Sequence, residues 1–196
     1  MNPSRIKNVT AIVLAGGNSS RMKGSDKSML PVRGVPMISH IVRQLELHFD
    51  EVIIGSGDVE KYKFLGHMVV ADREKGCGPL MGIYSCLIAS ETDINFVTAC
   101  DIPYINISLI RKMLDLSEGA DIIVPVSGSD HYETLYAIYK KSVIPFAADL
   151  LSEGKFKISG LFEKVETRFI PFDPGTWYHN INYEEDYRNF NDDSFD

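Results

Sequence analysis

The residues with the clearest chemical potential lie between positions 14 and 27, where the chain reads LAGGNSSRMKGSDK. Two adjacent glycines let the backbone turn sharply and bring its N–H groups close to a ligand. Serine hydroxyls follow, and Arg21 and Lys27 add fixed positive charge. Such a loop suits a phosphate chain, because it combines donors and cations without bulky side chains. We predict that it binds a nucleoside triphosphate through Leu14, Ala15, Gly16, Gly17 and Lys27.

A purely structural turn is the alternative interpretation of this loop. Glycine pairs after strands are common, and the segment matches neither the GxxxxGK[ST] phosphate loop nor the GxGxxG dinucleotide loop. A binding role is favoured by the joint occurrence of the two glycines, Arg21-Met22 and Asp26-Lys27 in one connection.

Asp101 is the second candidate, because it directly follows the apolar residues 94–100. Its carboxylate should therefore project from the carboxyl end of a strand, where ligands bind in open α/β sheets. Mg²⁺ takes one or two protein carboxylates and completes its shell with phosphate oxygens and water. We predict that Asp101 binds Mg²⁺ beside the triphosphate. The alternative is that Asp101 caps the next turn, with Pro103 ending the strand.

The elements that position these residues follow from the apolar pattern. Strand-like runs alternate with helix-like segments, which predicts an α/β protein with βαβ units and a mostly parallel sheet. The expected strands are residues 9–14, 51–55, 68–71, 94–100 and 121–126, with less regular ones at 133–139 and 168–172. The expected helices are residues 37–47, 79–89, 107–116, 143–151 and 183–190, the third capped by Asn106 or Ser108.

Composition narrows the class of protein. The 196 residues predict a single domain over residues 1–190, followed by a frayed acidic tail at 191–196. The net charge of −7 argues against a nucleic-acid surface. We find no signal peptide and no apolar run long enough for a membrane span. The three cysteines lack CxxC spacing, so free thiols in the cytoplasm are expected, and the five histidines show no zinc-ligand spacing.

Four motifs resemble those of one protein family. They are the loop at 14–27 with a Gly-x-Pro at 34–36, GPLMG at 78–82, CDIPY at 100–104 and NINYEE at 180–185. In this order, and over almost the whole chain, they are similar to the motifs of the molybdenum cofactor guanylyltransferases. That family has a three-layer αβα, Rossmann-like domain of the nucleotidyltransferase type, and the resemblance implies the same fold here.

The resemblance implies a specific reaction. The terminal phosphate of molybdopterin would attack the α-phosphorus of GTP, and pyrophosphate would leave. The nucleophile is already an anion, so no general base is required. Arg21, Lys27 and a Mg²⁺ on Asp101 would catalyse the step by positioning and charge neutralisation. The implied partners are these two substrates, with transient contacts to other proteins of cofactor biosynthesis or to recipient apoenzymes.

The resemblance also implies contacts to the nucleoside. Asp72 matches an aspartate near the nucleotide, although a solvated turn residue is the alternative. Gly78 and Pro79 begin a helix whose dipole would point toward the site, and Gly82 would allow close approach of the base or ribose. Family members carry an asparagine after the second strand, for which Ser56 or a backbone group would substitute here.

The choice of base and the pterin contacts rest on fewer residues. LAGG goes with guanine, whereas relatives that use CTP read LAAG. Asn180 and Asn182 offer amide groups to the pterin, or alternatively form an Asx turn. Lys155 and Lys157 are candidate phosphate contacts, although exposed lysines are the default. The sequence at 132–134, Tyr-Glu-Thr, departs from the family pattern.

Two other functions remain open at this point. One keeps the chemistry and changes the substrate, as a CTP-dependent molybdopterin transferase or a sugar- or polyol-phosphate nucleotidyltransferase. The other is a non-catalytic protein that binds nucleotide or carries molybdopterin, against which the presence of both Lys27 and Asp101 argues.

Overall fold

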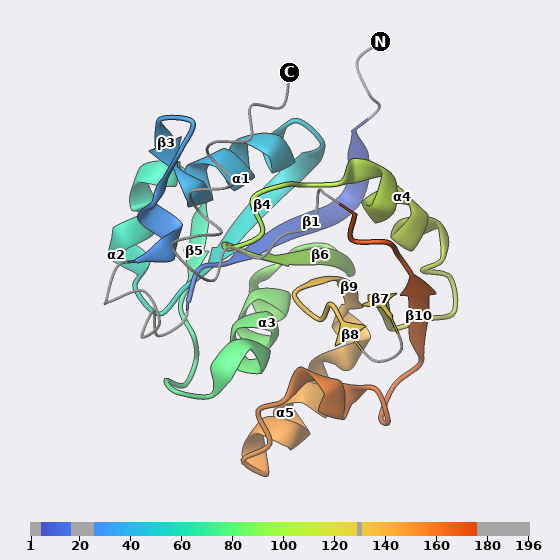
Figure 1. Ribbon diagram of the computed structural model, residues 1–196. Helices are drawn as coiled ribbons and strands as arrows, with labels where there is room; N and C mark the ends of the chain where they lie inside the picture. The colour runs from blue at the N-terminus through green and yellow to red at the C-terminus, as the bar shows by residue number, and fades with distance from the viewer. Residues whose placement is uncertain (1–4, 17–25, 129–130, 176–196) are drawn as a thin grey trace.

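The computed structural model describes residues 5–16, 26–128 and 131–175, and these form a mixed β-sheet with helices on both faces (Figure 1). The predicted helix at 183–190 and the predicted tail at 191–196 lie outside the described residues. The strands are β1 (Ile6–Leu14), β4 (Phe49–Gly55), β5 (Met68–Val70), β6 (Ile94–Ala99), β7 (Ile122–Ser127), β8 (His131–Tyr132), β9 (Tyr136–Lys140) and β10 (Thr167–Pro171).

The strand order is β10-β7-β9-β6-β1-β4-β5, with β8 paired to β7. Strands β6, β1, β4 and β5 are mutually parallel, as the alternation of strand-like and helix-like segments predicts. Strand β9 is antiparallel to both β6 and β7. It begins at Tyr136, three residues later than predicted, because residues 133–136 form a turn in which the Tyr136 N–H donates to the Glu133 carbonyl at 3.0 Å.

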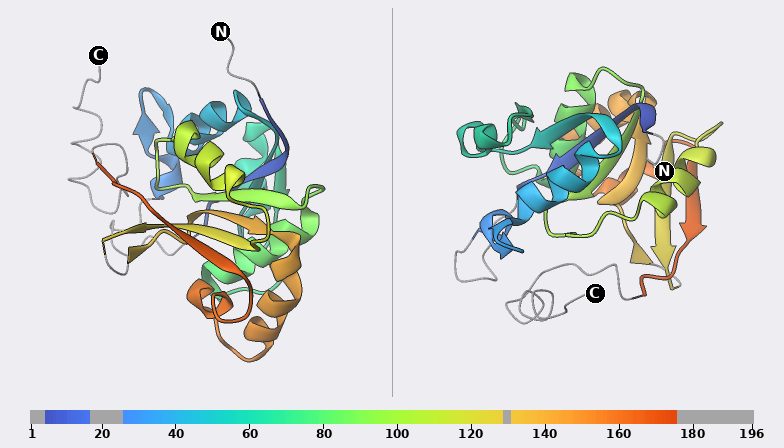
Figure 2. Two further views of the ribbon diagram at one scale, coloured as in Figure 1. Left: turned by 90° about the vertical axis from the view of Figure 1, so that its right-hand side faces the viewer. Right: turned by 90° about the horizontal axis from the view of Figure 1, so that it is seen from above.

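Helices cover both faces of the sheet and confirm the three-layer architecture. Helices α1 (Met37–Glu46) and α4 (Ile107–Asp115) pack on one face, and α3 (Gly78–Ala89) and α5 (Ile144–Ser152) on the other (Figure 2). The alternating side chains of β1 serve both layers, since Ala11 and Val13 belong to one core and Ile12 and Leu14 to the other. Asn106 caps α4 by accepting a hydrogen bond from the Leu109 N–H at 3.0 Å.

Several short elements were not expected from the sequence. The two-residue strands β2 (Pro31–Val32) and β3 (Val35–Pro36) form a hairpin, and its turn residues Arg33 and Gly34 both have positive φ. Helix α2 (Val59–Tyr62) follows β4, and a 3-10 turn, η2 (Lys27–Met29), precedes the hairpin. These elements surround the end of β1 and therefore the predicted site (Figure 1).

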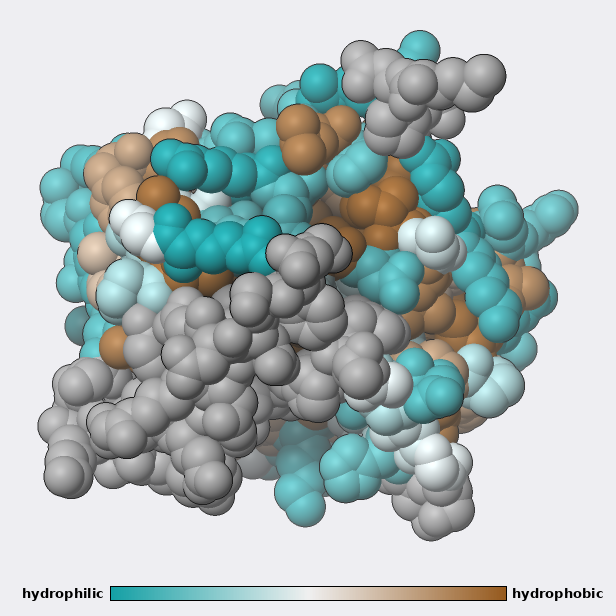
Figure 3. Space-filling model, turned by 45° about the horizontal axis from the view of Figure 1, so that its top comes forward, coloured by the Kyte–Doolittle hydropathy of each residue, from teal (hydrophilic) through white to brown (hydrophobic). Residues whose placement is uncertain are grey.

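The surface seen in Figure 3 is largely hydrophilic where it is coloured, with hydrophobic patches between the polar side chains. Within the described part of the chain, none of the helices has both the length and the apolar character needed to cross a membrane.

Candidate nucleotide site

The carboxyl ends of the four parallel strands meet in a single row. The register pairs Leu14 with both Gly55 and Ala99, and Gly55 with Val70. Residues that directly follow these four positions must therefore emerge at the same edge of the sheet. The predicted residues at 15–16, 72 and 101 all do so.

The first residues of the glycine loop continue the sheet. The Ala15 N–H donates to the Gly55 carbonyl at 2.8 Å, and the Leu14 carbonyl accepts from the Cys100 N–H at 3.0 Å. Gly16 is exposed, and no described atom lies within 4 Å of where a side chain would begin. Gly16 is therefore the first position at which a ligand can approach the backbone. Gly17 and Arg21 lie outside the described residues, as do Asn180 and Asn182.

Tight packing behind the loop depends on two glycines. A Cβ on Gly55 would lie 2.7 Å from both Cys86 Sγ and Leu14 Cδ2, so this position accepts only glycine without a shift of its neighbours. At Gly82 the same atom would lie 3.3 Å from Leu14 and 3.6 Å from Asp72 Oδ1. The space beside Gly82 is thus filled by protein side chains, which corrects the expectation that a base or ribose approaches there.

Asp72 is half-buried, and its carboxylate lies against the first turn of α3, beside Gly82. Burial raises the pKa of this carboxyl above its ordinary value. This partial burial disfavours the alternative that Asp72 is a freely solvated turn residue. Asp72 follows β5, so it lies at the same edge of the sheet as Asp101. Its contact with a nucleoside stays a prediction.

Asp101 is half-buried and lies in the turn after β6, with Cys100 between it and the last residue of the strand. Burial raises its pKa, and the positive charge of Lys27 opposes part of that rise. The two residues that the sequence singled out for phosphate chemistry therefore lie within electrostatic range of each other. The helix that follows, α4, is capped by Asn106 and not by Asp101.

The segment after Asp101 is held by two residues that the sequence did not single out. Gln44 of α1 donates from Nε2 to the Pro103 carbonyl at 2.7 Å and accepts from the Ile105 N–H at 3.2 Å. The Tyr136 hydroxyl, at the start of β9, accepts from the Asn106 N–H at 2.7 Å. These hydrogen bonds fix the chain that presents Asp101. The apolar stripe of α1 reveals only its buried face and gives no sign of this role.

The start of α3 lies at the same edge. Gly78 has a φ of +67°, which favours glycine, and Pro79 stands in the first turn. The N-cap residue, Cys77, makes no side-chain capping hydrogen bond, so its side chain satisfies none of the first-turn N–H groups. Burial and the carboxylates of Glu74 and Asp72 raise the pKa of the Cys77 thiol, which disfavours a reactive thiolate.

Ser56 does not replace the family asparagine through its side chain. It is 3% exposed, and its hydroxyl accepts a hydrogen bond from the Asp58 N–H at 3.1 Å. The Ser56 N–H donates to the Val70 carbonyl at 2.9 Å. The hydroxyl thus serves the turn between β4 and α2, and the N–H serves the pairing with β5. Of the two alternatives for replacing the family asparagine, the Ser56 hydroxyl is therefore disfavoured.

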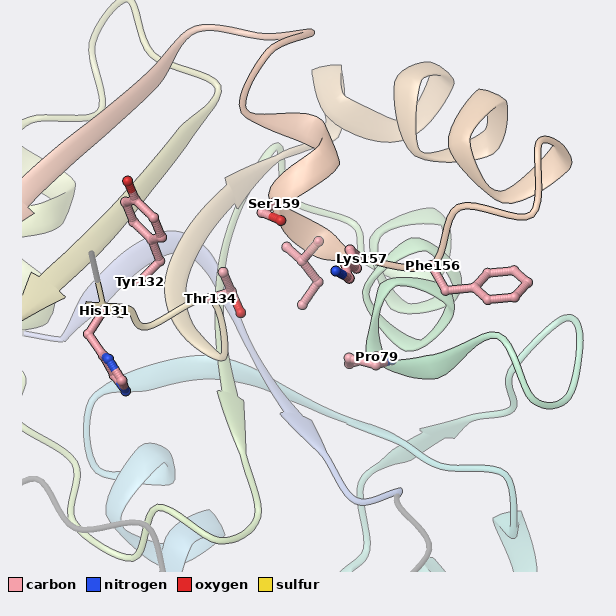
Figure 4. A pocket seen from close by; sticks show the side chains of 8 residues that line it. Pro79, His131, Tyr132, Thr134, Phe156, Lys157 and Ser159 are labelled. Atoms are coloured by element: carbon pink, nitrogen blue, oxygen red, sulfur yellow. The ribbon is translucent and has the colours of Figure 1, made fainter.

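A cavity of about 480 Å³ lies next to the start of α3. The polar ends of Thr134, Lys157 and Ser159 surround the same space, with Pro79 on its other side (Figure 4). Its remaining lining residues are His131, Tyr132, Phe156 and Ile158. Lys157 is thus placed at a cavity, whereas Lys155 forms an ion pair with Glu153 at 2.7 Å. The cavity offers cationic and hydroxyl groups beside apolar surface.

The side chains at this edge of the sheet can be compared with the ligands that Mg²⁺ needs. Among the described residues, no three His, Cys, Asp or Glu side chains cluster as ligands for a metal ion. A fully protein-ligated metal would require such a cluster, but Mg²⁺ bound with a triphosphate needs only one or two carboxylates. Asp101 fits that need as a half-buried oxygen donor at the edge where the phosphates are predicted.

Comparison with known proteins gives concordant matches. The profile of the MobA-like NTP transferase domain matches residues 11–167. A probable molybdenum cofactor guanylyltransferase of Pelotomaculum thermopropionicum is 37% identical over 82% of this chain and 78% of its own length. The molybdenum cofactor guanylyltransferase of Vibrio campbellii is 31% identical over 91% and 93%.

A solved structure agrees with the fold. The molybdopterin-guanine dinucleotide biosynthesis protein A of Archaeoglobus fulgidus superposes with a TM-score of 0.78 at 22% identity, over 93% of this chain and 96% of its own.

Proposed function

This chain belongs to the family of MobA-like NTP transferases, and on that premise we propose that it transfers GMP from GTP to the terminal phosphate of molybdopterin. The observation that carries the proposal is its 31–37% identity, over most of its length, to relatives named molybdenum cofactor guanylyltransferases. The product is the guanine dinucleotide form of the molybdenum cofactor, and pyrophosphate is released.

The chemistry is a displacement at phosphorus. A phosphate oxygen of molybdopterin forms a bond to the α-phosphorus of GTP, and the bond from that phosphorus to the bridging oxygen breaks, so pyrophosphate leaves with the electron pair. The attacking oxygen carries no proton that must be removed. The barrier is electrostatic, because two polyanions must meet while charge develops on the leaving group.

Lys27 and Asp101 are the central groups in the proposal. Lys27 places a positive charge beside the phosphates, and Arg21 adds a second cation from the same loop. Asp101 would hold Mg²⁺, which when bound neutralises charge on the phosphate oxygens. Gly16, Gly17 and the start of α3 at Gly78 and Pro79 supply backbone room and N–H groups to the nucleotide.

We assign the second substrate, molybdopterin, to the cavity beside the start of α3. The cavity beside Pro79 contains Lys157, His131 and two hydroxyls for a phosphate, and Ile158 as apolar surface for a heterocycle. Phe156 lies close enough to Gly78 that a Cβ there would be 3.9 Å from its side chain, so the cavity adjoins the proposed nucleotide residues. Asn180 and Asn182 stay in the proposal as further pterin contacts.

The cellular setting forms part of the proposal. Three free cysteines suit the reducing cytoplasm, where GTP is available. The dinucleotide product must pass to other proteins, so transient contacts with recipient apoenzymes or other cofactor-synthesis proteins are expected.

The proposal is tested with the full chain, MgCl₂ and each of the four nucleoside triphosphates. We expect GTP to raise the melting temperature most, and pyrophosphate release only when molybdopterin is also present. Release with CTP in place of GTP would assign a cytidylyltransferase. A nucleotide that binds without any pyrophosphate release would instead indicate a carrier or sensor.

A further inference from the structure

Lys27 lies in the 3-10 turn η2, and Asp26 holds the start of that turn. Asp26 Oδ1 accepts hydrogen bonds from the Ser28 N–H at 3.0 Å and from the Ser28 hydroxyl at 2.8 Å. Its Oδ2 forms an ion pair with the ammonium of Lys61, on α2. Both oxygens of this carboxylate are therefore engaged in fixing the turn.

A buried hydrogen bond connects the same turn to Tyr62. The Ser28 hydroxyl gives its proton to Asp26, so it accepts one from the Tyr62 hydroxyl, 2.8 Å away. Ser28 is 1% exposed and Tyr62 is 2% exposed, which shields this hydrogen bond from water. Burial raises the pKa of Tyr62, so its hydroxyl stays protonated and remains a donor at physiological pH.

Helix α2 is itself fixed to the carboxyl edge of the sheet. Its N-cap residue, Asp58, accepts a hydrogen bond from the Lys61 N–H at 3.2 Å. The Asp58 N–H in turn donates to Ser56, whose own N–H donates to the end of β5. Strands β4 and β5 thus determine where Tyr62 and Lys61 stand.

The turn lies within electrostatic range of the residues that follow β6. The charge of Lys27 acts on Asp101 and on Cys100, and the charge of Lys61 also acts on Cys100. A shift of η2 would consequently change the position of the Lys27 ammonium relative to the Asp101 carboxylate.

We propose that Tyr62 and Lys61 are positioning residues, which hold the Ser28 and Asp26 side chains and so aim the Lys27 ammonium at the triphosphate beside Asp101. The catalytic part of this inference rests on the proposed function, whereas the geometric part does not. The two parts are therefore tested by separate readouts.

The geometric readout is the reactivity of the Lys27 amine in the full chain, measured as its rate of acetylation by acetic anhydride with mass spectrometry. Tyr62→Phe removes one oxygen from a buried side chain and should accelerate acetylation of Lys27 about threefold or more, the scale of one lost hydrogen bond. Lys61→Met should do the same, and Lys61→Arg should restore the slow rate.

Ser90→Ala is the matched control. The Ser90 hydroxyl is likewise buried, at 2% exposure, and donates to Thr10 Oγ1 at 3.0 Å, next to the start of β6 rather than its end. This variant should leave Lys27 acetylation unchanged. Equal Lys27 rates in wild type, Tyr62→Phe and Lys61→Met would overturn the inference, and so would an equal acceleration in Ser90→Ala.

The catalytic readout is a double-mutant cycle on GMP transfer. Tyr62→Phe should lower kcat about 3- to 10-fold with a smaller change in the KM for GTP, and it should have no further effect in a Lys27→Ala background. The same loss in both backgrounds would show that Tyr62 does not act through Lys27. If the wild-type chain transfers no nucleotide, the proposed function fails, and the acetylation rates still decide the positioning role.

Discussion

At the scale of single residues, the site depends on one cation and one carboxylate that lie close together. Lys27 and Asp101 are 74 positions apart in sequence (101 minus 27), yet the charge of Lys27 acts on Asp101. The sequence could predict the edge at which Asp101 emerges, because this residue follows an apolar run and the carboxyl ends of parallel strands share an edge. Gln44 and Tyr62 could not be predicted, since their roles arise from contacts between elements.

Lys27→Ala should lower the turnover of GMP transfer by about 10²–10³-fold, the scale of losing one group that stabilises developing charge. The KM for GTP should change less, because the charge on the leaving group is greatest in the transition state. Steady-state pyrophosphate release measures both constants. Turnover within about twofold of wild type would remove Lys27 from the mechanism.

Asp101→Asn should stabilise the fold while it abolishes transfer. The raised pKa of Asp101 means that the folded protein disfavours the charged carboxylate, so wild-type stability is lower above that pKa than below it. In EDTA, Asp101→Asn should therefore melt at a higher temperature than wild type at pH 7. The difference should vanish as the pH falls through the raised pKa toward the ordinary value of about 3.9.

Glu118→Gln, at an exposed turn, is the control for charge removal alone. Thermal melts across this pH range would contradict the account if wild type were the more stable protein at pH 7, or if both variants gained equally.

At the scale of elements, periodicity predicted the long strands and helices and missed the short ones. Helix α1 and strand β1 could be predicted from local sequence, because the apolar residues of each recur with the spacing of its buried face or run. The hairpin β2–β3 has two residues in each strand, and α2 has four, which is too short for any period to emerge. The antiparallel direction of β9 is set by its pairing with β6 and β7, which no local pattern encodes.

Gly55→Ala should destabilise the protein by about 1–3 kcal/mol, the usual cost of overpacking a filled core. The added carbon would lie 2.7 Å from Cys86 Sγ and Leu14 Cδ2, between β4, β1 and α3. Urea unfolding measures the change. Gly57→Ala is the matched control, because no atom of the described residues beyond the two chain neighbours lies within 4 Å of the added carbon there, and it should change stability far less. Equal effects of the two substitutions would refute this packing.

At the scale of the whole molecule, the two substrate sites that we propose are formed by different parts of the chain. Strands β1, β4, β5 and β6 present the proposed nucleotide residues, whereas the segment from β8 to α5 and beyond forms most of the cavity proposed for the acceptor. The start of α3 adjoins the cavity, since Pro79 lines it and a Cβ on Gly78 would lie 3.9 Å from Phe156. The acceptor half was the less predictable one, because its cavity is built from a loop, a two-residue strand and residues 156–159.

This separation predicts that the two substrates can be weakened independently. Lys157→Ala should raise the KM for molybdopterin about 10- to 100-fold, the scale of losing one hydrogen bond to a charged group, and leave the affinity for GTP unchanged. Calorimetry measures the dissociation constant for GTP, and initial rates at varied molybdopterin concentration measure the KM for molybdopterin. Lys155→Ala is the control, as its side chain pairs with Glu153 outside the cavity lining. Weaker GTP binding by Lys157→Ala would contradict the division.

The most direct measurement follows the α-phosphorus itself. The full chain is incubated with molybdopterin, MgCl₂ and GTP that is labelled at either the α- or the γ-phosphate. The pterin product is then separated, and its mass and label are measured by mass spectrometry. We predict that the α-label appears in a pterin product heavier by one GMP and that the γ-label appears only in pyrophosphate. A γ-label on the pterin, or a folded protein that binds GTP yet leaves molybdopterin unchanged in mass, would contradict guanylyl transfer.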